Sequence, residues 1–398
     1  MTQLEPFNEN SYYQDPAAFF ARLRETRPVA PMPGHGRSWL ITRYADVRSA
    51  LTDPRLAKDV RHWPGASRSP AGEASASVHA HMLNSDPPVH TRLRRLARQA
   101  FTPHRVAQLR PFAQEIAAGL LDEMAAARGG VVDLLDVYAR PLPVAVLCEL
   151  LGIPEADRER MRVAVADYDR PEEVKRVARE LGVYFTTLIA AKRAEPGDDL
   201  LSALVPASTS ASEGGTEDWL TSTELRSTAF QLLIAGFDST VNLIASGTLA
   251  LLTHPEEMAR LREDPSLLPA AVEELLRFTN PLNHATTRFT TEDLTVGEVM
   301  IPAGEWVFLA TSSANRDPAR FPHPDRLDLC RDTSGHVAFG HGIHYCLGAP
   351  LARMEAEVAF GALLARFPGM SLAVSPEKLR WRPVSLINGL ESLPVHLA

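Results

Sequence analysis

The sequence predicts a mainly α-helical protein with small β-sheets. Apolar residues recur at helical spacing along much of the chain, and the longest such stretch runs from 221 to 254. Short runs typical of strands occur at 39–42 and again at 299–301 and 306–309. No linker rich in Gly, Ser or Pro divides the 398 residues cleanly, so we expect one domain with a large core.

The composition argues against several classes of function. The net charge is −8, from 41 basic and 49 acidic residues, which disfavours a general nucleic-acid-binding surface. Three cysteines are too few for a disulfide framework and suit a reducing cytoplasm. Residues 1–27 lack the apolar core of a signal peptide. The stretch 229–252 could span a bilayer by length, but Asp238 at its middle favours a buried helix. We therefore expect a cytoplasmic protein that binds neither nucleic acid nor membrane.

The first half of the chain contains several shorter helices. Asp15-Pro16 opens an amphipathic helix, and residues 60–84 show no regular pattern. A loop of that length is usually functional or disordered. The other predicted helices of this half cover 44–51, 101–128, 142–151 and, with a break near Arg170, 158–193.

A helix entered through Pro87-Pro88 carries a candidate anion site. His90 and Arg94 lie four residues apart on one face of it. Such a pair can hold a carboxylate, because a guanidinium binds both carboxylate oxygens at once.

The stretch 221–254 is expected to cross the core, because it is apolar on nearly all faces. Thr221 and Glu224 form a capping box at its start. Asp238 is costly in such a helix unless it is paired or hydrated, and a structural partner is the alternative to a functional role. The Ser239 hydroxyl can bond back to the carbonyl of Ala235.

Further pairs and turns mark the region between 270 and 396. Glu274 and Arg277 lie three apart on one helix face, which alone is a weak signal. The runs 299–301 and 306–309, joined by Pro302-Ala303-Gly304, indicate a strand–turn–strand. Residues 381–396 are expected to form a hairpin about Asn388-Gly389.

The most informative stretch surrounds Cys346. An apolar row at helical spacing follows it, with Pro350 in the first turn, so Cys346 lies just before a helix N-terminus. Free N–H groups there favour a thiolate. Gly342 and Gly348 remove side chains on either side, which would let a flat ligand approach. A single thiolate of this kind suits an axial ligand of haem iron, and the alternative is a buried structural cysteine.

The full spacing Phe-x-x-Gly-x-x-x-Cys-x-Gly, from Phe339 to Gly348, resembles the haem-binding loop of the cytochrome P450 family. Matches extend over 38–396, and the residues at 85–94 and 315–318 look like those of soluble actinobacterial members. The resemblance implies a cytochrome P450 fold in a single domain of residues 1–398, with haem b between the long helix and the Cys loop. It also implies that Cys346 is the proximal iron ligand.

The resemblance assigns roles to other positions as well. The implied cofactor-binding residues are His90, Arg94, Arg288 and His344 at the propionates, Phe339, Gly340 and Gly348 in the Cys loop, and Ala235 and Gly236 in the oxygen-binding groove, where Gly236 leaves space for O₂ or water. The implied catalytic residues are Asp238, Ser239 and Thr240, with Ser239 standing where Thr is usual. The implied structural ion-pair network, which holds the Cys loop, joins Glu274, Arg277 and Arg326.

The implied reaction is reductive activation of O₂, with one oxygen atom inserted into a C–H or C=C bond. No nucleotide-binding glycine motif is present, so electrons should come from NAD(P)H through a separate ferredoxin and its reductase. Arg92, Arg95 and Arg98 form either a docking patch for the carrier or a solvated helix face.

The leading substrate is a bulky hydrophobic natural product such as a macrolide or polyketide, with terpenoids, steroids and fatty acids left open. Two alternatives to the monooxygenase remain. One is a peroxide-driven or non-hydroxylating haem-thiolate oxidase, and the other is a non-enzymatic haem-thiolate sensor or ligand carrier. We expect a monomer.

Overall fold

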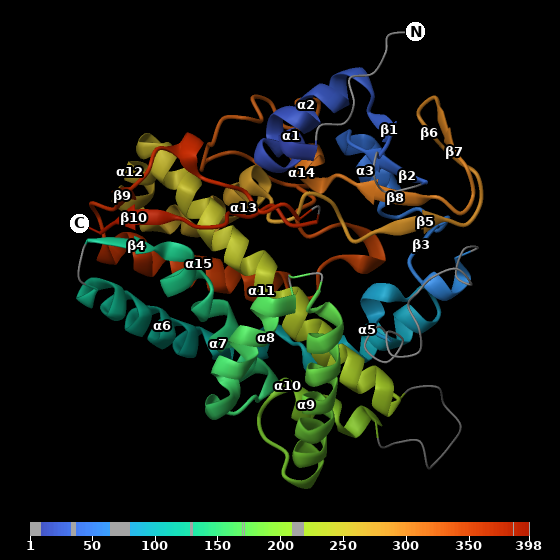
Figure 1. Ribbon diagram of the computed structural model, residues 1–398, viewed down its shortest axis with the longest axis horizontal. Coiled ribbons are helices and arrows are strands. Elements are labelled where there is room, and N and C mark those ends of the chain that lie inside the picture. Colours follow the sequence, from blue (N-terminus) through green and yellow to red (C-terminus); the bar gives the residue numbers. More distant parts are fainter. Residues whose placement is uncertain are drawn as a thin grey trace.

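The computed structural model describes residues 9–32, 37–63, 80–127, 130–168, 170, 172–208, 219–384 and 386–397. The predictions that concern residues 1–8 and most of the loop at 60–84 lie outside the described residues. The described chain is mainly helical with small sheets, so the predicted fold class is confirmed (Figure 1).

The predicted helices are confirmed, with small shifts at their ends. In chain order the described α-helices are α1 Glu9–Gln14, α2 Pro16–Thr26, α3 Tyr44–Ala50, α5 Val89–Ala100, α6 Pro103–Ala126, α7 Pro141–Leu151, α8 Arg158–Tyr168, α9 Val174–Ala194, α10 Leu200–Leu204, α11 Ser222–Thr253, α12 Pro255–Glu263, α13 Leu268–Thr279, α14 Thr311–Asn315 and α15 Ala349–Arg366.

Helix α11 runs through the middle of the molecule, in yellow in Figure 1. Its capping box is confirmed: the Thr221 hydroxyl accepts from Glu224 N at 3.1 Å, and the Glu224 carboxylate accepts from Thr221 N at 2.8 Å. The helix packs against α7, α9, α13 and α15. It is long and apolar enough to cross a bilayer, but 61% of its most apolar window is buried within the fold, as predicted for a core helix.

The larger sheet joins strands from both halves of the chain, in the order β1-β2-β8-β5-β3. Strands β2 and β8 are parallel, with Ser38 opposite Trp306 and Ile41 opposite Leu309. The bounds are β1 Val29–Pro31, β2 Ser38–Ile41, β3 Leu56–Ala57, β5 Arg288–Thr290 and β8 Trp306–Leu309.

The predicted strand–turn–strand over 299–309 is confirmed, but its two strands belong to different sheets. Strand β7 (Val299–Ile301) pairs back with β6 (Leu294–Val296) in a separate two-stranded sheet. Strand β8 buries Val307, Phe308 and Leu309 in the core, whereas Met300 of β7 is exposed. The more apolar strand, β8, therefore lies within the large sheet, whereas β7 and β6 form a separate, more exposed pair.

The predicted C-terminal hairpin is wrong in its pairing. Trp381 bridges Leu390, but β10 (Pro394–His396) lies between β4 (Val131–Asp133) and β9 (Ser371–Leu372) in a three-stranded sheet. The Asn388 amide donates to the Thr279 carbonyl at 2.7 Å. Asn388 thus docks this loop on α13 instead of forming a two-residue turn.

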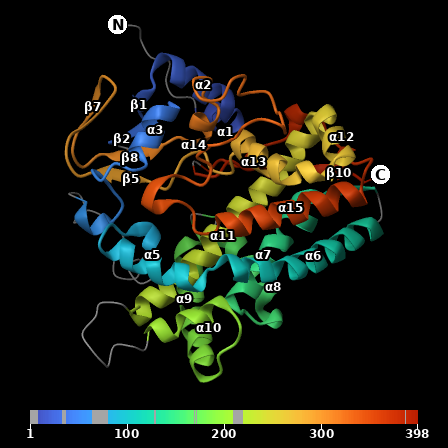
Figure 2. The same ribbon diagram turned by 180° about the vertical axis from the view of Figure 1, so that it is seen from behind.

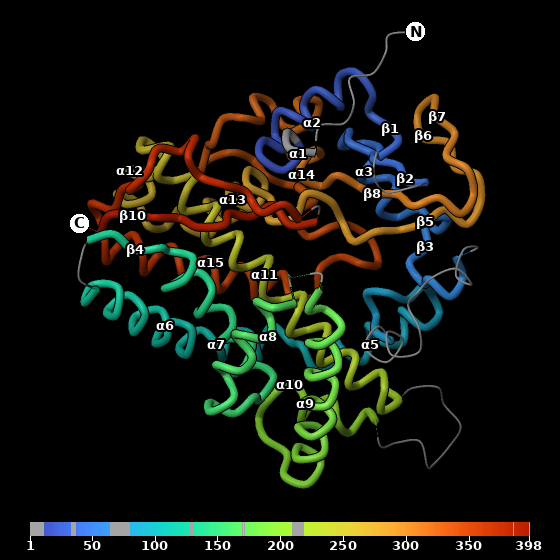
Figure 3. Tube along the Cα trace, viewed as in Figure 1, coloured from blue at the N-terminus to red at the C-terminus, as the bar shows by residue number. Residues whose placement is uncertain are grey.

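Helix α15 places the Cys loop against the helical core. It packs on α6, α11 and α13, and Figure 2 shows α5, α6 and α15 from the same side. The trace in Figure 3 follows the chain from α14, in orange, through a long irregular segment to α15, in red. Cys346 therefore lies where the irregular segment enters α15.

Candidate active site

The Cys loop is a sequence of tight turns closed by its own backbone. Gly340 and Gly342 have φ of 72° and 76°, a region that favours glycine. Cys346 N donates to the Phe339 carbonyl at 2.9 Å. A Cβ on Gly342 would lie 2.8 Å from Cγ2 of Thr52, after α3, so this glycine lets the loop pack on its neighbour. The absence of a side chain at Gly342 therefore allows the loop to contact Thr52. The sequence had suggested instead that it lets a ligand approach.

The electrostatics of Cys346 differ from the prediction. The residue is exposed by surface area, yet protein atoms crowd its sulfur and raise the pKa of the thiol above its usual value. The N–H groups of Gly348 and Ala349 and the guanidinium groups of Arg94 and Arg353 act in the opposite direction. The helix N-terminus alone therefore does not hold a thiolate here. A bound metal cation would, because coordination deprotonates a thiol.

Phe339 is fixed above the loop by a cation. The Arg353 guanidinium lies 4.6 Å from the centre of the Phe339 ring and bonds to Glu273, whose Oε2 is 2.9 Å from Arg353 Nη2. The Phe339 and Tyr345 ring centres are 6.2 Å apart. Sequence reasoning missed Arg353 and Glu273, because they lie 80 residues apart and meet only in the fold.

The four predicted propionate residues converge beside the Cys loop. The rings of His90 and His344 lie 4.3 Å apart, and Arg94 Nη2 donates to the Tyr345 carbonyl at 2.5 Å. Arg288 on β5 is 4% exposed, and its Nη1 donates to the Leu51 carbonyl at 3.1 Å. The fold thus brings together residues from α5, β5 and the Cys loop, as predicted.

Burial and mutual repulsion lower the pKa values of these basic groups. Burial, together with neighbouring cations that include Arg94, lowers the pKa of His90 to about 4 and of His344 to about 2. Burial lowers the pKa of Arg288 to about 10. A buried lysine, Lys58, belongs to the same cluster and contributes to both histidine shifts; sequence reasoning missed it.

The cluster fits a ligand that carries carboxylates. Both ring nitrogens of His90 and Nε of Arg288 are buried and have no hydrogen-bond partner among the described residues. Unpartnered buried donors are costly, and a group of cations that repel one another is stabilised by an anion. The two propionates of haem supply both acceptors and negative charge. With one cysteine sulfur beside this cluster, the residues fit haem b.

The predicted oxygen groove lies at the middle of α11. Ala235 is exposed, and the Ser239 hydroxyl donates to its carbonyl at 3.3 Å, as predicted. A Cβ on Gly236 would lie 2.9 Å from Cδ2 of Leu147 on α7. Gly236 therefore permits close packing of α11 on α7.

Asp238 has a structural partner in the C-terminal loop. Its Oδ1 accepts from Arg382 Nη1 at 2.8 Å and from Asn242 Nδ2 at 3.0 Å. Its Oδ2 is buried without a hydrogen-bond partner in the described part of the chain. The alternative left open by the sequence, a paired core charge, is therefore observed. Arg382 lies 144 residues away in sequence, so no local pattern could reveal it.

Thr240 points to a different neighbour from Ser239. It is 3% exposed, and its hydroxyl donates to the Gly236 carbonyl at 3.2 Å. It also interacts with Glu355 of α15, a carboxyl that is 1% exposed. Burial raises the pKa of Glu355 well above its usual value, and the Thr240 hydroxyl lowers it. Sequence reasoning missed Glu355, an acid in the interface between α11 and α15.

The buried ion pair behind the Cys loop is confirmed. Arg277 donates to Glu274 through Nε at 2.7 Å and Nη2 at 2.8 Å, and neither side chain has exposed surface. Arg277 Nη1 donates to the carbonyls of Asn315 and Pro324, both at 2.9 Å. The Asn315 side chain accepts from Val337 N at 2.7 Å. These bonds connect α13 through α14 to the start of the Cys loop.

The third partner of this pair is Arg331, and the prediction of Arg326 is wrong. Arg331 Nε lies 3.2 Å from Glu274 Oε1. Arg326 is exposed and contributes its carbonyl, which accepts from Arg331 Nη2 at 3.1 Å. The chain turns between the two arginines, so the later one reaches the carboxylate.

The predicted basic patch is smaller than expected. Arg92 is ion-paired with Glu224 and donates to the Trp219 carbonyl, so it ties α5 to the start of α11. Arg95 and Arg98 are exposed on α5. The patch is therefore limited to these two arginines on this helix.

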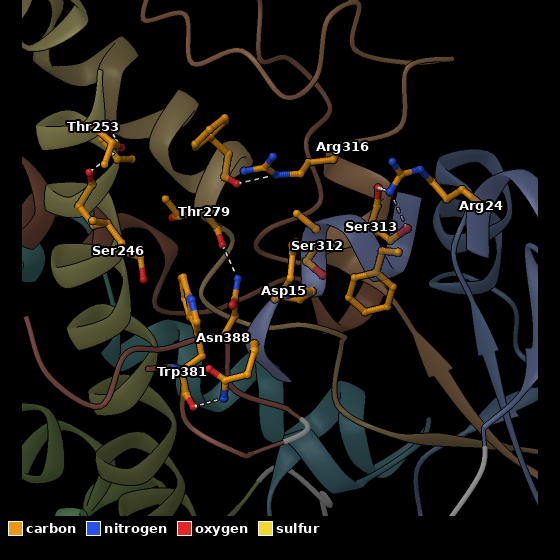
Figure 4. A pocket seen from close by; sticks show the side chains of 17 residues that line it. Asp15, Arg24, Ser246, Thr253, Thr279, Ser312, Ser313, Arg316, Trp381 and Asn388 are labelled. Atoms are coloured by element: carbon orange, nitrogen blue, oxygen red, sulfur yellow. Dashed lines mark hydrogen bonds between the residues drawn. The ribbon is translucent and has the colours of Figure 1, made fainter. Parts of the chain in front are cut away.

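A separate cavity of about 200 Å³ lies between α1, α2, α11, α13 and α14. Figure 4 shows Arg24 turned toward Ser313 and Asn388 toward Thr279, with hydrogen bonds that close its walls. None of the predicted haem-site or catalytic residues lines it. The cavity is therefore distinct from the site around Cys346.

Comparisons with known proteins agree with this geometry. A family model described as Cytochrome P450 matches residues 172–380. The chain is 47% identical over 386 residues to the cytochrome P450 monooxygenase PikC of Streptomyces venezuelae, covering 96% of this chain and 91% of PikC. It is 41% identical over 404 residues to the polyketide biosynthesis cytochrome P450 PksS of Bacillus subtilis, covering 97% of each.

Among solved structures, the tirandamycin C-bound P450 monooxygenase TamI aligns with a TM-score of 0.87 and 47% identity. The alignment covers 98% of this chain and 99% of that one. Sequence identity and fold therefore agree over nearly the whole chain, and the family model matches its second half. The protein belongs to the cytochrome P450 family and is a haem-dependent monooxygenase.

Proposed function

We propose that this monooxygenase hydroxylates or epoxidises a bulky hydrophobic natural product of the macrolide or polyketide type. The substrate class is supported by the relatives: one is named for polyketide biosynthesis, and TamI binds tirandamycin C. The haem site is supported by one observation above all, the convergence of His90, Arg94, Arg288 and His344 beside Cys346. The whole chain, residues 1–398, would act as a single haem domain.

Each side chain of the cluster has a separate task in this proposal. When bound, haem supplies the reductive activation of O₂. Cys346 would ligate the iron, Phe339, Gly340 and Gly348 would shape the loop around its sulfur, and Ala235 and Gly236 would line the oxygen-binding groove on α11. His90, Arg94, Arg288 and His344 bind the two propionates. Glu274, Arg277 and Arg331 keep the loop in position, because their bonds run to the segment that begins at Val337.

We assign proton delivery to α11. Asp238 places a carboxyl between the C-terminal loop and the core, and Ser239 offers a hydroxyl one residue on. Arg382 occupies Oδ1 of Asp238, so Oδ2, which has no partner among the described residues, is the oxygen that would carry the proton. Thr240 is directed toward Glu355, so it supports the helix interface or a second proton route.

We further propose that a cytoplasmic ferredoxin, reduced from NAD(P)H by its reductase, supplies the electrons to a monomeric enzyme. Arg95 and Arg98 are exposed on the helix that also carries His90 and Arg94. An acidic carrier docked there would lie near the haem edge that these residues hold.

The test is turnover by the purified protein with a surrogate ferredoxin, its reductase and NADPH, on a panel of macrolides and other polyketides. Hits are first selected by the Soret change on binding. The proposal expects a product that contains one atom from ¹⁸O₂. A product lacking that label, or one formed with peroxide alone, would point to the oxidase alternative. Tight binding without any turnover would point to a carrier.

A further inference from the structure

Lys58 is a buried lysine whose ammonium lacks an ion pair. It directly follows β3 and is 4% exposed. Its Nζ donates to the Thr286 hydroxyl. Within the described ranges, no carboxylate oxygen lies within ion-pair distance of Nζ. A buried charge without a counter-ion is strongly unfavourable, so the state of this amine depends on what enters the site.

The nearest carboxylate, Asp86, is already committed to the backbone. Its two oxygens accept from Lys58 N at 3.1 and 3.0 Å, and Oδ2 also accepts from Asp59 N at 2.9 Å. Asp86 therefore anchors the chain that carries Lys58, and it faces the amine without pairing with it. The negative charge of Asp86 raises the pKa of Lys58, but by less than burial and Arg288 lower it.

The other charged groups around Lys58 repel it. Burial and the positive charge of Arg288 lower its pKa well below the usual value. In turn the charge of Lys58 lowers the pKa of His90 and of His344. The amine thus faces one guanidinium, two imidazoles and one committed carboxylate, an arrangement that an incoming anion would stabilise.

The choice of lysine at this position is informative. The sequence contains four lysines among 41 basic residues, so arginine is the usual cation of this chain. A guanidinium stays protonated when buried, whereas a lysine amine can lose its proton. Lysine allows the fold to form around an uncharged amine and still offers a cation once a counter-ion arrives.

We propose that Lys58 is a further cofactor-binding residue, which binds a carboxylate of the haem and takes up a proton from solvent as the haem enters. This inference rests on the proposed haem site. No bond is made or broken apart from the N–H bond, because R–NH₂ and H⁺ give R–NH₃⁺. Haem binding is then coupled to proton uptake at Lys58, in addition to the contacts of the arginines and histidines.

The sign of the pH dependence follows from linkage. The pKa of Lys58 is lowered in the haem-free protein and raised when a carboxylate pairs with it. Between these two values haem affinity falls as pH rises, and haem is lost faster as pH passes the haem-bound value.

The test measures haem transfer from the holoenzyme to excess apomyoglobin across a range of pH. Lys58→Met removes the charge and keeps an unbranched side chain of similar size. It should lose haem roughly 10- to 100-fold faster, the range of one charge-assisted hydrogen bond, and without the high-pH step. Lys58→Arg should lose haem slowly and also lack that step. Lys378→Met, at an exposed lysine, is the matched control and should behave as the wild type.

A second readout is the reduction potential of the same holoenzymes. Loss of a cation near the haem should shift the potential of Lys58→Met to more negative values than those of Lys378→Met. Identical haem loss, pH profile and potential in wild type and Lys58→Met would overturn the proposal. If that happens while the wild type forms product, the proposed function stands and Lys58 alone is misassigned. A clear Lys58 effect without any product would instead refute the proposed activity.

Discussion

The buried ion pair behind the Cys loop and the cation cluster beside it differ in one respect. Glu274 and Arg277 have no exposed surface. The Arg277 guanidinium donates to the Glu274 carboxylate and to two backbone carbonyls. In the cluster, His90 and Arg288 keep buried nitrogens that no described residue satisfies. The first region is complete without a ligand, and the second is completed by one. This difference separates scaffold from binding site without reference to any family.

The largest expected effect breaks the complete region. The variants Glu274→Ala and Arg277→Ala should fold poorly and contain little haem. Removing one member of a buried pair costs about 3–5 kcal/mol of stability. That is a large share of a typical stability of about 5–15 kcal/mol. Thermal unfolding and haem content measure the effect.

Two variants sharpen this prediction. Arg331→Ala should destabilise the protein by less, because Arg331 is a secondary partner at 3.2 Å. Arg326→Ala should unfold like the wild type, since it removes an exposed side chain and leaves the carbonyl in place. Normal haem content in both Glu274→Ala and Arg277→Ala would mean that the pair does not hold the site.

The next effect concerns chemistry and leaves the fold intact. Asp238→Asn should slow turnover by roughly 10²–10⁴-fold, the usual loss for a missing general acid, with substrate binding retained. Arg382→Met tests the partner, because it removes the ion pair and leaves the acid. Single-turnover rates and the solvent isotope effect are the measurements. If Asp238→Asn keeps the wild-type rate and isotope effect, protons follow another route, with Glu355 as the first candidate.

A smaller effect is expected at the surface. Arg95→Glu or Arg98→Glu should slow ferredoxin-supported turnover several-fold and flatten its salt dependence, because long-range attraction is screened by salt. Arg179→Glu, at an exposed arginine of α9, should not. Peroxide-supported turnover should be unchanged in all three. Equal loss in both assays would show that Arg95 and Arg98 act on the haem or on folding.

The smallest effect is expected at Ser239. Ser239→Thr should preserve or improve the product formed per NAD(P)H, because a β-branched side chain holds its hydroxyl in fewer rotamers. Ser239→Ala should lower that ratio more than it lowers NAD(P)H consumption. A ratio unchanged in both variants would leave Ser239 without a role in coupling.

The sequence predicted what is local and missed what the fold brings together. The helix of Thr221 and Glu224, the pair Glu274 and Arg277, and the bond from Ser239 to Ala235 lie within four residues, so spacing reveals them. The pairing of β8 depends on which strand is buried, which spacing does not contain.

The site shows the same limit. The family motif brought attention to His90, Arg94, Arg288 and His344, but their neighbours came only from the structure. Such contacts include Lys58 with Thr286, separated by 228 residues, and Arg382 with Asp238, separated by 144. A lysine in an irregular segment carries no periodic signal, and its burial becomes apparent only in the folded chain.

The most direct test of the central claim, that Cys346 ligates haem beside the cation cluster, is the spectrum of the reduced protein with CO. The wild type should show the far-red-shifted Soret band of thiolate ligation. Cys330→Ser, at an exposed cysteine away from the site, should keep that band, and Cys346→His should lose it. The same band in Cys346→His would contradict the assignment of the ligand and, with it, the account of the site.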